Sequence, residues 1–181
     1  MRRLKTCICC ILAGALGCMP VRAAAQGDAG SVALGLPPSA FPDLPPALQK
    51  DLERRGCTVP QVPTDSTPHN VIHGRFHRAK QGDWAVLCSV HGYSSILVFW
   101  GGSPQHPGEV AVATDADCVR ASDSAPARFD RAISLADSAA IPTTQPVLIT
   151  HDGIRDVCGG KRSLYYWDDD PKRWIPLVAG R

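Results

Sequence analysis

The chain has 181 residues, of which 44% are hydrophobic, and it carries 19 basic and 17 acidic side chains. Four of the basic residues and none of the acidic ones lie in the first 25 positions, so residues 26–181 hold 15 basic against 17 acidic residues, a net charge of −2. Proteins that bind nucleic acids neutralise phosphates with an excess of lysine and arginine. This balance therefore excludes nucleic acid as a partner.

Residues 1–25 have the three parts of a secretory signal. A basic segment at 1–5 precedes an uncharged, largely apolar run at 6–19, and three alanines at 23–25 provide a small-residue cleavage site. The apolar run has about 14 residues, fewer than the roughly 20 of a permanent membrane-spanning helix. The sequence therefore predicts a signal peptide and an exported mature chain, periplasmic or extracellular, with no transmembrane span.

Lipidation is the alternative fate of the amino terminus. Cys18 follows Gly17, as at the site where bacterial lipoproteins are cleaved and acylated, and a lipid on Cys18 would anchor the mature chain to a membrane. Ala15 occupies the third position before this cysteine, where leucine is usual. We therefore favour a signal peptide that is simply removed.

The folded domain is expected to follow a flexible tether. Residues 26–43 are rich in alanine, glycine and proline, a composition typical of linkers. About 156 residues follow the signal peptide, which is enough for one domain with one hydrophobic core. We assign residues 44–181 to a single α+β domain.

A helix is predicted at residues 45–55. Two prolines suit its first turn, where backbone N–H groups have no partner inside the helix. Leu44, Leu48 and Leu52 recur at spacings of four and form one apolar stripe. Gly56 can adopt the left-handed conformation that often ends a helix. We expect this N-terminal helix to cover one face of a sheet.

Most of the remaining chain is expected to form antiparallel sheet. In residues 84–90 and 95–100 both alternating faces are apolar, which predicts central strands covered on two sides. Residues 58–69 contain three prolines and are predicted to be a loop. Residues 128–136 fit either a strand or a short helix. Further extended segments are predicted at 70–78, 109–114 and 147–150.

The carboxyl-terminal segment predicts a hairpin. Residues 164–167 and 173–178 are extended segments on either side of the polar turn at 168–171. Pro176 has no backbone N–H to donate, so its strand is expected at a sheet edge. The predicted fold is α+β, mainly antiparallel sheet with an N-terminal helix, and stabilised by disulfides.

Four cysteines remain after the signal peptide: Cys57, Cys88, Cys118 and Cys158. An even number in an exported chain predicts two disulfides, for which three connectivities exist. All four are at least 30 residues apart, whereas structural zinc sites take their ligands in close pairs, so disulfides are favoured over zinc. We take Cys57–Cys88 with Cys118–Cys158 as a working hypothesis, and the spacing leaves the other two connectivities open.

Residues 151–156 have the character of a catalytic loop. His151 beside Asp152 could act as a general base, and Arg155 could orient an anionic substrate. The Asp-Gly pair in this segment is also common in turns, and Arg155 could serve only to pair with a neighbouring acid. A hydrolase centred on His151 and Asp152 is therefore our alternative hypothesis.

Tyr166 and Trp167 are the candidate binding residues. They follow Tyr165, and a strand must point consecutive side chains to opposite faces. At least one of the three rings is then expected to meet solvent or another element, where an aromatic side chain offers large contact area at low entropic cost. Filling the core is the other role open to them.

Metal, calcium and serine-nucleophile sites are not supported by their patterns. His69, His73 and His77 lie on a predicted strand, where residues four apart are about 13 Å from each other. The acidic clusters at 115–117 and 168–170 lack the alternating oxygens and glycine of a calcium loop. The Gly-x-Ser-x-Gly context of many hydrolases does not occur. We expect neither a metal nor a cofactor.

Four segments resemble a family of uncharacterised exported bacterial proteins. They are LERRGC at 52–57, DWAVLCS at 83–89, SILVFW at 95–100 and HDGI at 151–154. Together they span most of residues 44–178. The resemblance implies a bacterial envelope protein, and it implies no catalytic residue because the family has no assigned activity.

The leading functional hypothesis is non-catalytic binding of a protein or a cell-envelope component. It rests on the small size of the domain, its disulfides and the lack of any legible catalytic motif. Such a domain would act as an inhibitor or an accessory factor.

Overall fold

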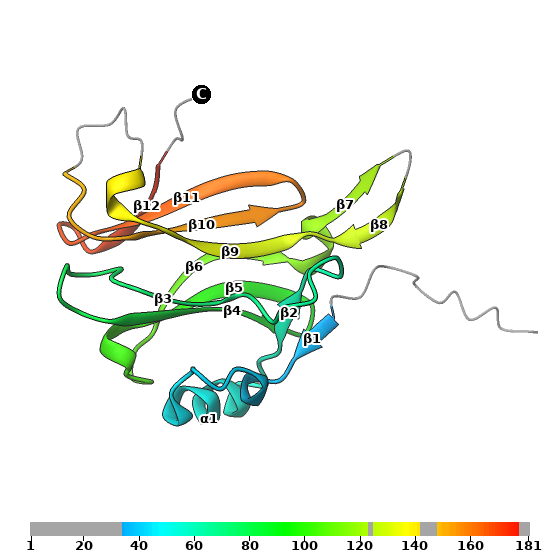
Figure 1. Cartoon of the computed structure of the whole chain (residues 1–181), viewed down its shortest axis with the longest axis horizontal. Coiled ribbons are helices and arrows are strands. Elements are labelled where there is room, and N and C mark those ends of the chain that lie inside the picture. The colour runs from blue at the N-terminus through cyan, green and yellow to red at the C-terminus, as the bar shows by residue number, and fades with distance from the viewer. Residues whose placement is uncertain (1–33, 123–124, 142–147, 178–181) are drawn as a thin grey trace, which may run out of the picture.

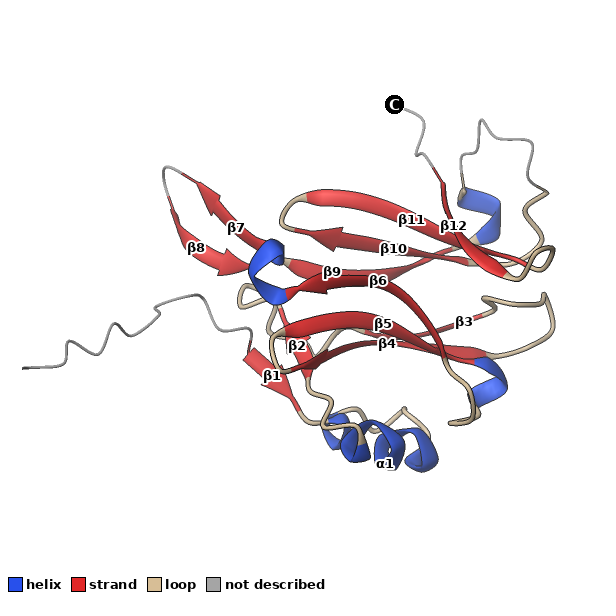
Figure 2. Ribbon diagram, turned by 180° about the vertical axis from the view of Figure 1, so that it is seen from behind, coloured by secondary structure: helices blue, strands red, loops and turns tan. Residues whose placement is uncertain are grey.

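The computed structural model describes residues 34–122, 125–141 and 148–177, and these residues form one α-helix and twelve strands. Two antiparallel sheets have four strands each, in the orders β3-β4-β5-β6 and β12-β11-β10-β9. The two sheets lie face to face, and α1 covers the outer face of the first (Figures 1 and 2). The prediction of a mainly antiparallel α+β fold is confirmed.

Two smaller sheets, β1-β2 and β7-β8, flank the large ones. The first half of the chain contains β1 (Leu34–Leu36), α1 (Pro46–Arg54), β2 (Val59–Gln61), β3 (Val71–Gly74), β4 (Asp83–Val90), β5 (Tyr93–Phe99) and β6 (Gly108–Thr114). The second half contains β7 (Val119–Ser122), β8 (Ala125–Phe129), β9 (Arg131–Ala136), β10 (Gly153–Cys158), β11 (Lys161–Asp168) and β12 (Arg173–Leu177). The 3-10 helices are η1 (Pro38–Ala40), η2 (Trp100–Gly102), η3 (Asp115–Cys118) and η4 (Ser138–Ala140).

Helix α1 packs against the first sheet through the apolar stripe predicted from the sequence. Leu44, Leu48 and Leu52 are fully buried in one cluster with Val86 and Phe99 of the sheet. The helix predicted at residues 45–55 is therefore present. The placement of a helix at the N-terminus is not confirmed, because β1 and η1 precede α1 in the described part of the chain.

Residues 34–43, the second part of the predicted tether, are packed against the domain. They form β1 and η1, and β1 pairs with β2 of the segment predicted as a loop. Pro38 and Phe41 are buried, and Phe41 belongs to the same apolar cluster as α1. The segment is rich in alanine, glycine and proline, and this composition gave no indication that these two side chains are buried.

The first sheet is apolar on both faces, as predicted for its central strands. Val86 and Phe99 face α1, whereas Leu87, Ile96 and Val98 face the second sheet. Because each of these side chains is largely or wholly removed from water, each contributes about 1.5–3 kcal/mol to folding. This sheet is the centre of the fold. Helix α1, from the first part of the chain, covers one face, and the second sheet, from the last part of the chain, covers the other.

The second sheet was predicted only in part. The hairpin of β11 and β12 is confirmed, and Pro176 lies on the edge strand β12. The ambiguous segment 128–136 is extended and contains β9. Residues 148–150 are not a strand, and β10 (Gly153–Cys158) occupies sequence that we had interpreted as a catalytic loop.

Both disulfides have the connectivity of the working hypothesis. Cys57, just after α1, is bonded to Cys88 in β4. Cys118 at the end of η3 is bonded to Cys158 at the end of β10. Their separations of 31 and 40 residues correspond to roughly 3–4 kcal/mol each in the chain-entropy model.

A buried ion pair of the second sheet is hydrogen-bonded to the first sheet through its arginine. Arg131 of β9 and Asp156 of β10 are both buried, and the Arg131 guanidinium also donates to the carbonyl and hydroxyl of Ser94 in β5 and to the carbonyl of Ala111 in β6. Asn70, also buried, accepts a hydrogen bond from the backbone N–H of β9 and donates to a carbonyl of the same strand. Buried polar groups thus fix how the sheets stack.

The predicted signal peptide at residues 1–25, with Cys18, lies outside the described residues, as do tether residues 26–33. In the part of the chain that the structure does describe, no helix has the length and apolar character needed to cross a membrane.

Candidate functional site

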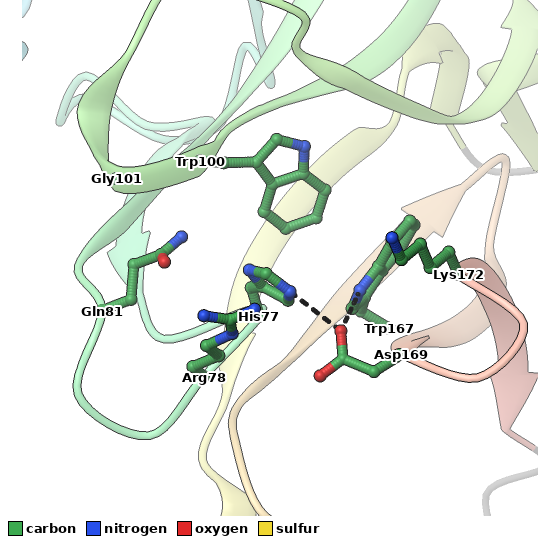
Figure 3. A pocket seen from close by; sticks show the side chains of 8 residues that line it. All are labelled: His77, Arg78, Gln81, Trp100, Gly101, Trp167, Asp169 and Lys172. Atoms are coloured by element: carbon green, nitrogen blue, oxygen red, sulfur yellow. Dashed lines mark hydrogen bonds and ion pairs between the residues drawn. The ribbon is translucent and has the colours of Figure 1, made fainter.

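A cavity of about 600 Å³ opens where three segments of the two stacked sheets meet (Figure 3). The segments are the loop after β3 (residues 77–81), the start of η2 (100–101), and the end of β11 with its turn into β12 (167–172). We call this cavity the tryptophan cleft. Its volume is within the range of about 300–1,000 Å³ that is usual for sites of small ligands.

Tryptophan rings form the wall of the cleft. The ring centres of Trp100 and Trp167 are 5.0 Å apart, and their planes are tilted by 51°. Trp174 packs behind both, with ring-centre distances of 5.8 Å to Trp100 and 5.5 Å to Trp167. Because the rings support one another, the wall is preformed and does not need to be assembled when a ligand arrives.

A histidine and a carboxylate complete the floor. The Nε2 atom of His77 lies 2.8 Å from Oδ1 of Asp169, and the indole N–H of Trp167 donates to the same oxygen at 2.9 Å. Figure 3 shows both contacts converging on Asp169. They fix the position of the carboxylate beside the rings and leave its second oxygen free of partners within the described residues.

The buried carboxylate of Asp83 holds the loop and η2 in place. Its Oδ2 atom accepts the backbone N–H groups of Phe76 and His77 at 2.9 and 3.1 Å. Its Oδ1 atom accepts the backbone N–H of Gly101 and the side-chain amide of Gln81, both at 2.7 Å. Asp83 therefore positions two of the three segments that line the cleft.

Two cations at the cleft are unpaired in the described part of the chain. Arg78 and Lys172 are exposed, and within the described residues their side chains have no ion-pair or hydrogen-bond partner. In Figure 3, Lys172 lies on the Trp167 side of the cleft and Arg78 near the imidazole of His77. Asp169 is the one carboxylate among the lining residues. The lining therefore carries a net positive charge.

The structure places His151 and Asp152 apart from the cleft, in a buried structural contact. Asp152 binds the guanidinium of Arg75 through both of its oxygens at 3.1 Å. It also accepts the backbone N–H groups of Arg75 at 3.0 Å and Ser138 at 3.2 Å. The carboxylate is thus fully occupied in joining the end of β3 to the segments around β10, and it has no oxygen free for a substrate.

The charge of Asp152 is stabilised by these partners. Burial raises the pKa of Asp152, but the side-chain hydrogen bond from Arg75, the backbone hydrogen bonds from Arg75 and Ser138, and the charge of Arg75 outweigh it. The pKa therefore lies below its ordinary value.

We expect Asp152→Asn to lower the free energy of unfolding by about 2 kcal/mol near neutral pH, because its amide would face backbone donors. A lowered native pKa stabilises the fold above the unfolded pKa of about 4, and this contribution is lost as the pH falls through the native value. The difference in the free energy of unfolding between wild type and variant should therefore become smaller in acid. Urea unfolding between about pH 3 and 7 measures it, and a difference that stays constant would contradict the role given to this carboxylate.

His151, Tyr166 and Arg155 are also occupied structurally. The ring of His151 stacks on that of Tyr166 at 4.2 Å, and both residues are buried. The Tyr166 hydroxyl accepts the backbone N–H of Thr150 at 3.0 Å. Arg155 donates to a backbone carbonyl of β9 at 2.7 Å. Of the sequence-derived site residues, Trp167 alone lines the cleft.

The three histidines at spacings of four are separated by the fold. His69 accepts a backbone N–H with its ring, His73 packs on Trp84 with ring centres 4.8 Å apart, and His77 lies in the cleft. Among the described residues, no three histidine, cysteine or carboxylate side chains are grouped as a metal site would require.

Sequence reasoning missed His77, Arg78 and Lys172 as parts of one site. Their segments are separated by about 90 residues, and only the stacking of the sheets brings them together. The usable signal was the consecutive aromatic residues of β11, followed at once by an acidic turn that ends in Lys172.

Comparison with known proteins leaves this site to be interpreted from its own geometry. The sequence matches no protein-family model and no curated protein, and no solved structure matches the chain.

Proposed function

We propose that this protein is an exported, non-catalytic domain that binds a cell-envelope component in the tryptophan cleft. The observation that carries the proposal is the juxtaposition of two tryptophan rings with the side chains of Arg78 and Lys172, which have no partner among the residues that the structure describes. Aromatic rings and arginine are the side chains that most often dominate binding energy at recognition sites. In the cleft the two rings lie at the ends of elements of the stacked sheets, on η2 and β11, and the two cations lie on the adjoining loop and turn, where function is commonly found.

Binding is better supported than hydrolysis. Asp152 is saturated by four hydrogen bonds, and His151 is stacked against a buried tyrosine, so neither is poised as a general base. Within the lining of the cleft there is one carboxylate, Asp169, whereas most glycoside hydrolases use a pair of them. The cleft has the parts of a binding site and lacks those of this reaction.

Export remains part of the proposal. Two disulfides are of the kind that persists in oxidising compartments outside the cytosol. With the signal sequence predicted at residues 1–25 they support our proposal of a periplasmic or extracellular location, which is also what the proposed resemblance to exported bacterial proteins would imply. A lipid-anchored form beginning at Cys18 is the alternative.

Native mass spectrometry of the protein recovered from its own envelope tests this proposal. We expect a polypeptide that begins at Gln26 and is lighter than the reduced chain by four hydrogen atoms because of its two disulfides, together with a population carrying a bound ligand. Trp167→Leu should abolish the ligand-bound population, because it removes one wall of the cleft.

The matched control is Trp84→Leu. Trp84 is also half-buried, but it packs on the α1 side of the first sheet and does not line the cleft. This variant should keep the ligand. Retention of the ligand by Trp167→Leu, or recovery of the bare polypeptide alone, would count against the cleft as the binding site. A polypeptide that begins at acylated Cys18 would replace the soluble form by an anchored one.

A further inference from the structure

The charge of the tryptophan cleft selects for an anion. Arg78 and Lys172 have no partners within the described residues, whereas the one lining carboxylate, Asp169, is already contacted by His77 and Trp167. Aromatic cages that bind cations place the ligand charge over ring faces, but here two unpaired cations would repel it. A negatively charged group would instead be attracted by both cations and could form a charge-assisted hydrogen bond with either one.

The geometry of the rings favours a puckered ring over a flat one. Trp100 and Trp167 are tilted by 51° with ring centres 5.0 Å apart, so a planar ligand can lie parallel to one of them only. A saturated sugar ring carries C–H groups on both of its faces and along its edge. It can therefore contact both indoles, whose faces are partially negative.

The remaining polar atoms of the cleft complement hydroxyl groups. The free oxygen of Asp169 and the side-chain carbonyl of Gln81 are acceptors without partners in the described part of the chain, while Arg78 and Lys172 are donors. A hydroxyl both donates and accepts, so a ligand rich in hydroxyls can satisfy both kinds of group. A purely apolar anion would leave the acceptors unpaired.

An extended acidic peptide fits the cleft less well. Peptides usually gain affinity by pairing their backbone with an exposed strand edge. Trp167 lies on β11, which is paired on both sides, and the other lining residues lie on loops, turns and a 3-10 helix. No free backbone edge is therefore offered by the lining of the cleft.

We propose that the ligand of the tryptophan cleft is an acidic saccharide, a glycan whose sugar ring bears a carboxylate. The sugar ring lies against Trp100 and Trp167, and its carboxylate is attracted by the two lining cations, Arg78 and Lys172. This inference rests on the proposed binding function and narrows it to one class of envelope component.

The test is a titration of the full mature chain, labelled at the tryptophan indoles and followed by NMR at low salt. The probes are two matched pairs of disaccharides that differ chiefly in their carboxylates. They are N-acetylglucosaminyl-N-acetylmuramic acid against N,N′-diacetylchitobiose, and digalacturonic acid against galactobiose. We expect an acidic member to bind about tenfold or more tightly than its neutral partner, with shifts at Trp100 and Trp167 but not at Trp84.

Substitutions of the two exposed cations test the contribution of charge to binding separately from the contribution of the tryptophan rings. Arg78→Gln and Lys172→Gln should each lower the affinity for the acidic sugar towards the affinity for the neutral sugar. Added salt should have the same effect. Lys161→Gln is the matched control, because Lys161 is an exposed lysine in the β10–β11 hairpin at the opposite end of the sheet. It should leave both affinities unchanged.

Different results would overturn the acidic saccharide and the proposed binding function. Equal binding of acidic and neutral sugars at Trp100 and Trp167 would overturn the acidic saccharide and leave the cleft as a binding site. Tighter binding of tetraglutamate or of choline at the same indoles would overturn it in the same way. If no disaccharide changes the NMR signals of these indoles, the proposal of an acidic saccharide is overturned. Native mass spectrometry alone then decides whether the cleft binds a ligand.

Discussion

Replacing Arg131 by methionine is expected to lower the free energy of unfolding by about 4 kcal/mol, because it leaves the carboxylate of Asp156 buried without its partner. Arg131 is 0% exposed. Its guanidinium contacts both oxygens of Asp156, at 3.3 and 3.1 Å, and the carbonyl and hydroxyl of Ser94 at 2.8 and 2.7 Å. Denaturant unfolding with the disulfides intact measures the change.

The double variant Arg131→Met with Asp156→Leu tests whether the loss arises from the orphaned charge. Replacing a buried ion pair by apolar residues of similar volume is often close to neutral, so the double variant should regain most of the lost stability. Arg155→Met is the control, because Arg155 lies on the neighbouring strand but makes only an exposed hydrogen bond to a backbone carbonyl. It should change stability by less than about 1 kcal/mol. A loss equally small for Arg131→Met would show that Arg131, with its ion pair and its hydrogen bonds to the first sheet, does not hold the sheets together.

Local patterns predicted the elements of this fold whose residues are neighbours in sequence. The leucine stripe of α1, the doubly apolar strands β4 and β5 and the hairpin of β11 and β12 each fit a single period or turn. Strand β10 escaped prediction because its centre alternates Ile154 and Asp156, both buried, with Arg155. A buried aspartate is intelligible only when its partner Arg131 is known.

The candidate site could not be predicted in the same way. His151 and Asp152 are adjacent in sequence, which predicts a shared catalytic role, but in the fold they contact the structural partners Tyr166 and Arg75. The tryptophan cleft instead joins segments at 77–81, 100–101 and 167–172. Each segment alone looks like an ordinary polar turn with an aromatic residue nearby. The stacking angle of two sheets brings them together, and no local pattern specifies that angle.

Replacing Asp83 by asparagine should therefore damage both the fold and the cleft. Asp83 is 0% exposed and accepts four hydrogen bonds, three of them from backbone N–H groups. An asparagine amide has one acceptor oxygen, and its NH₂ group would face donors. We expect a loss of about 3 kcal/mol in the free energy of unfolding, because hydrogen bonds to charged acceptors are worth about 1.5–3 kcal/mol each and are not additive.

The same variant should lose ligand binding even where it is still folded, because the backbones of His77 and Gly101 would no longer be held in place at the cleft. Binding by Asp83→Asn should be measured well below its melting temperature, beside Asp137→Asn. Asp137 is an exposed carboxylate that accepts a single backbone N–H in η4, at 2.8 Å, so its variant should fold and bind as the wild type does. If Asp83→Asn binds normally despite a large loss of stability, the cleft is positioned by the tryptophan stack alone. If it loses binding at full occupancy of the folded state, the carboxylate is the element that couples the central sheet to the site.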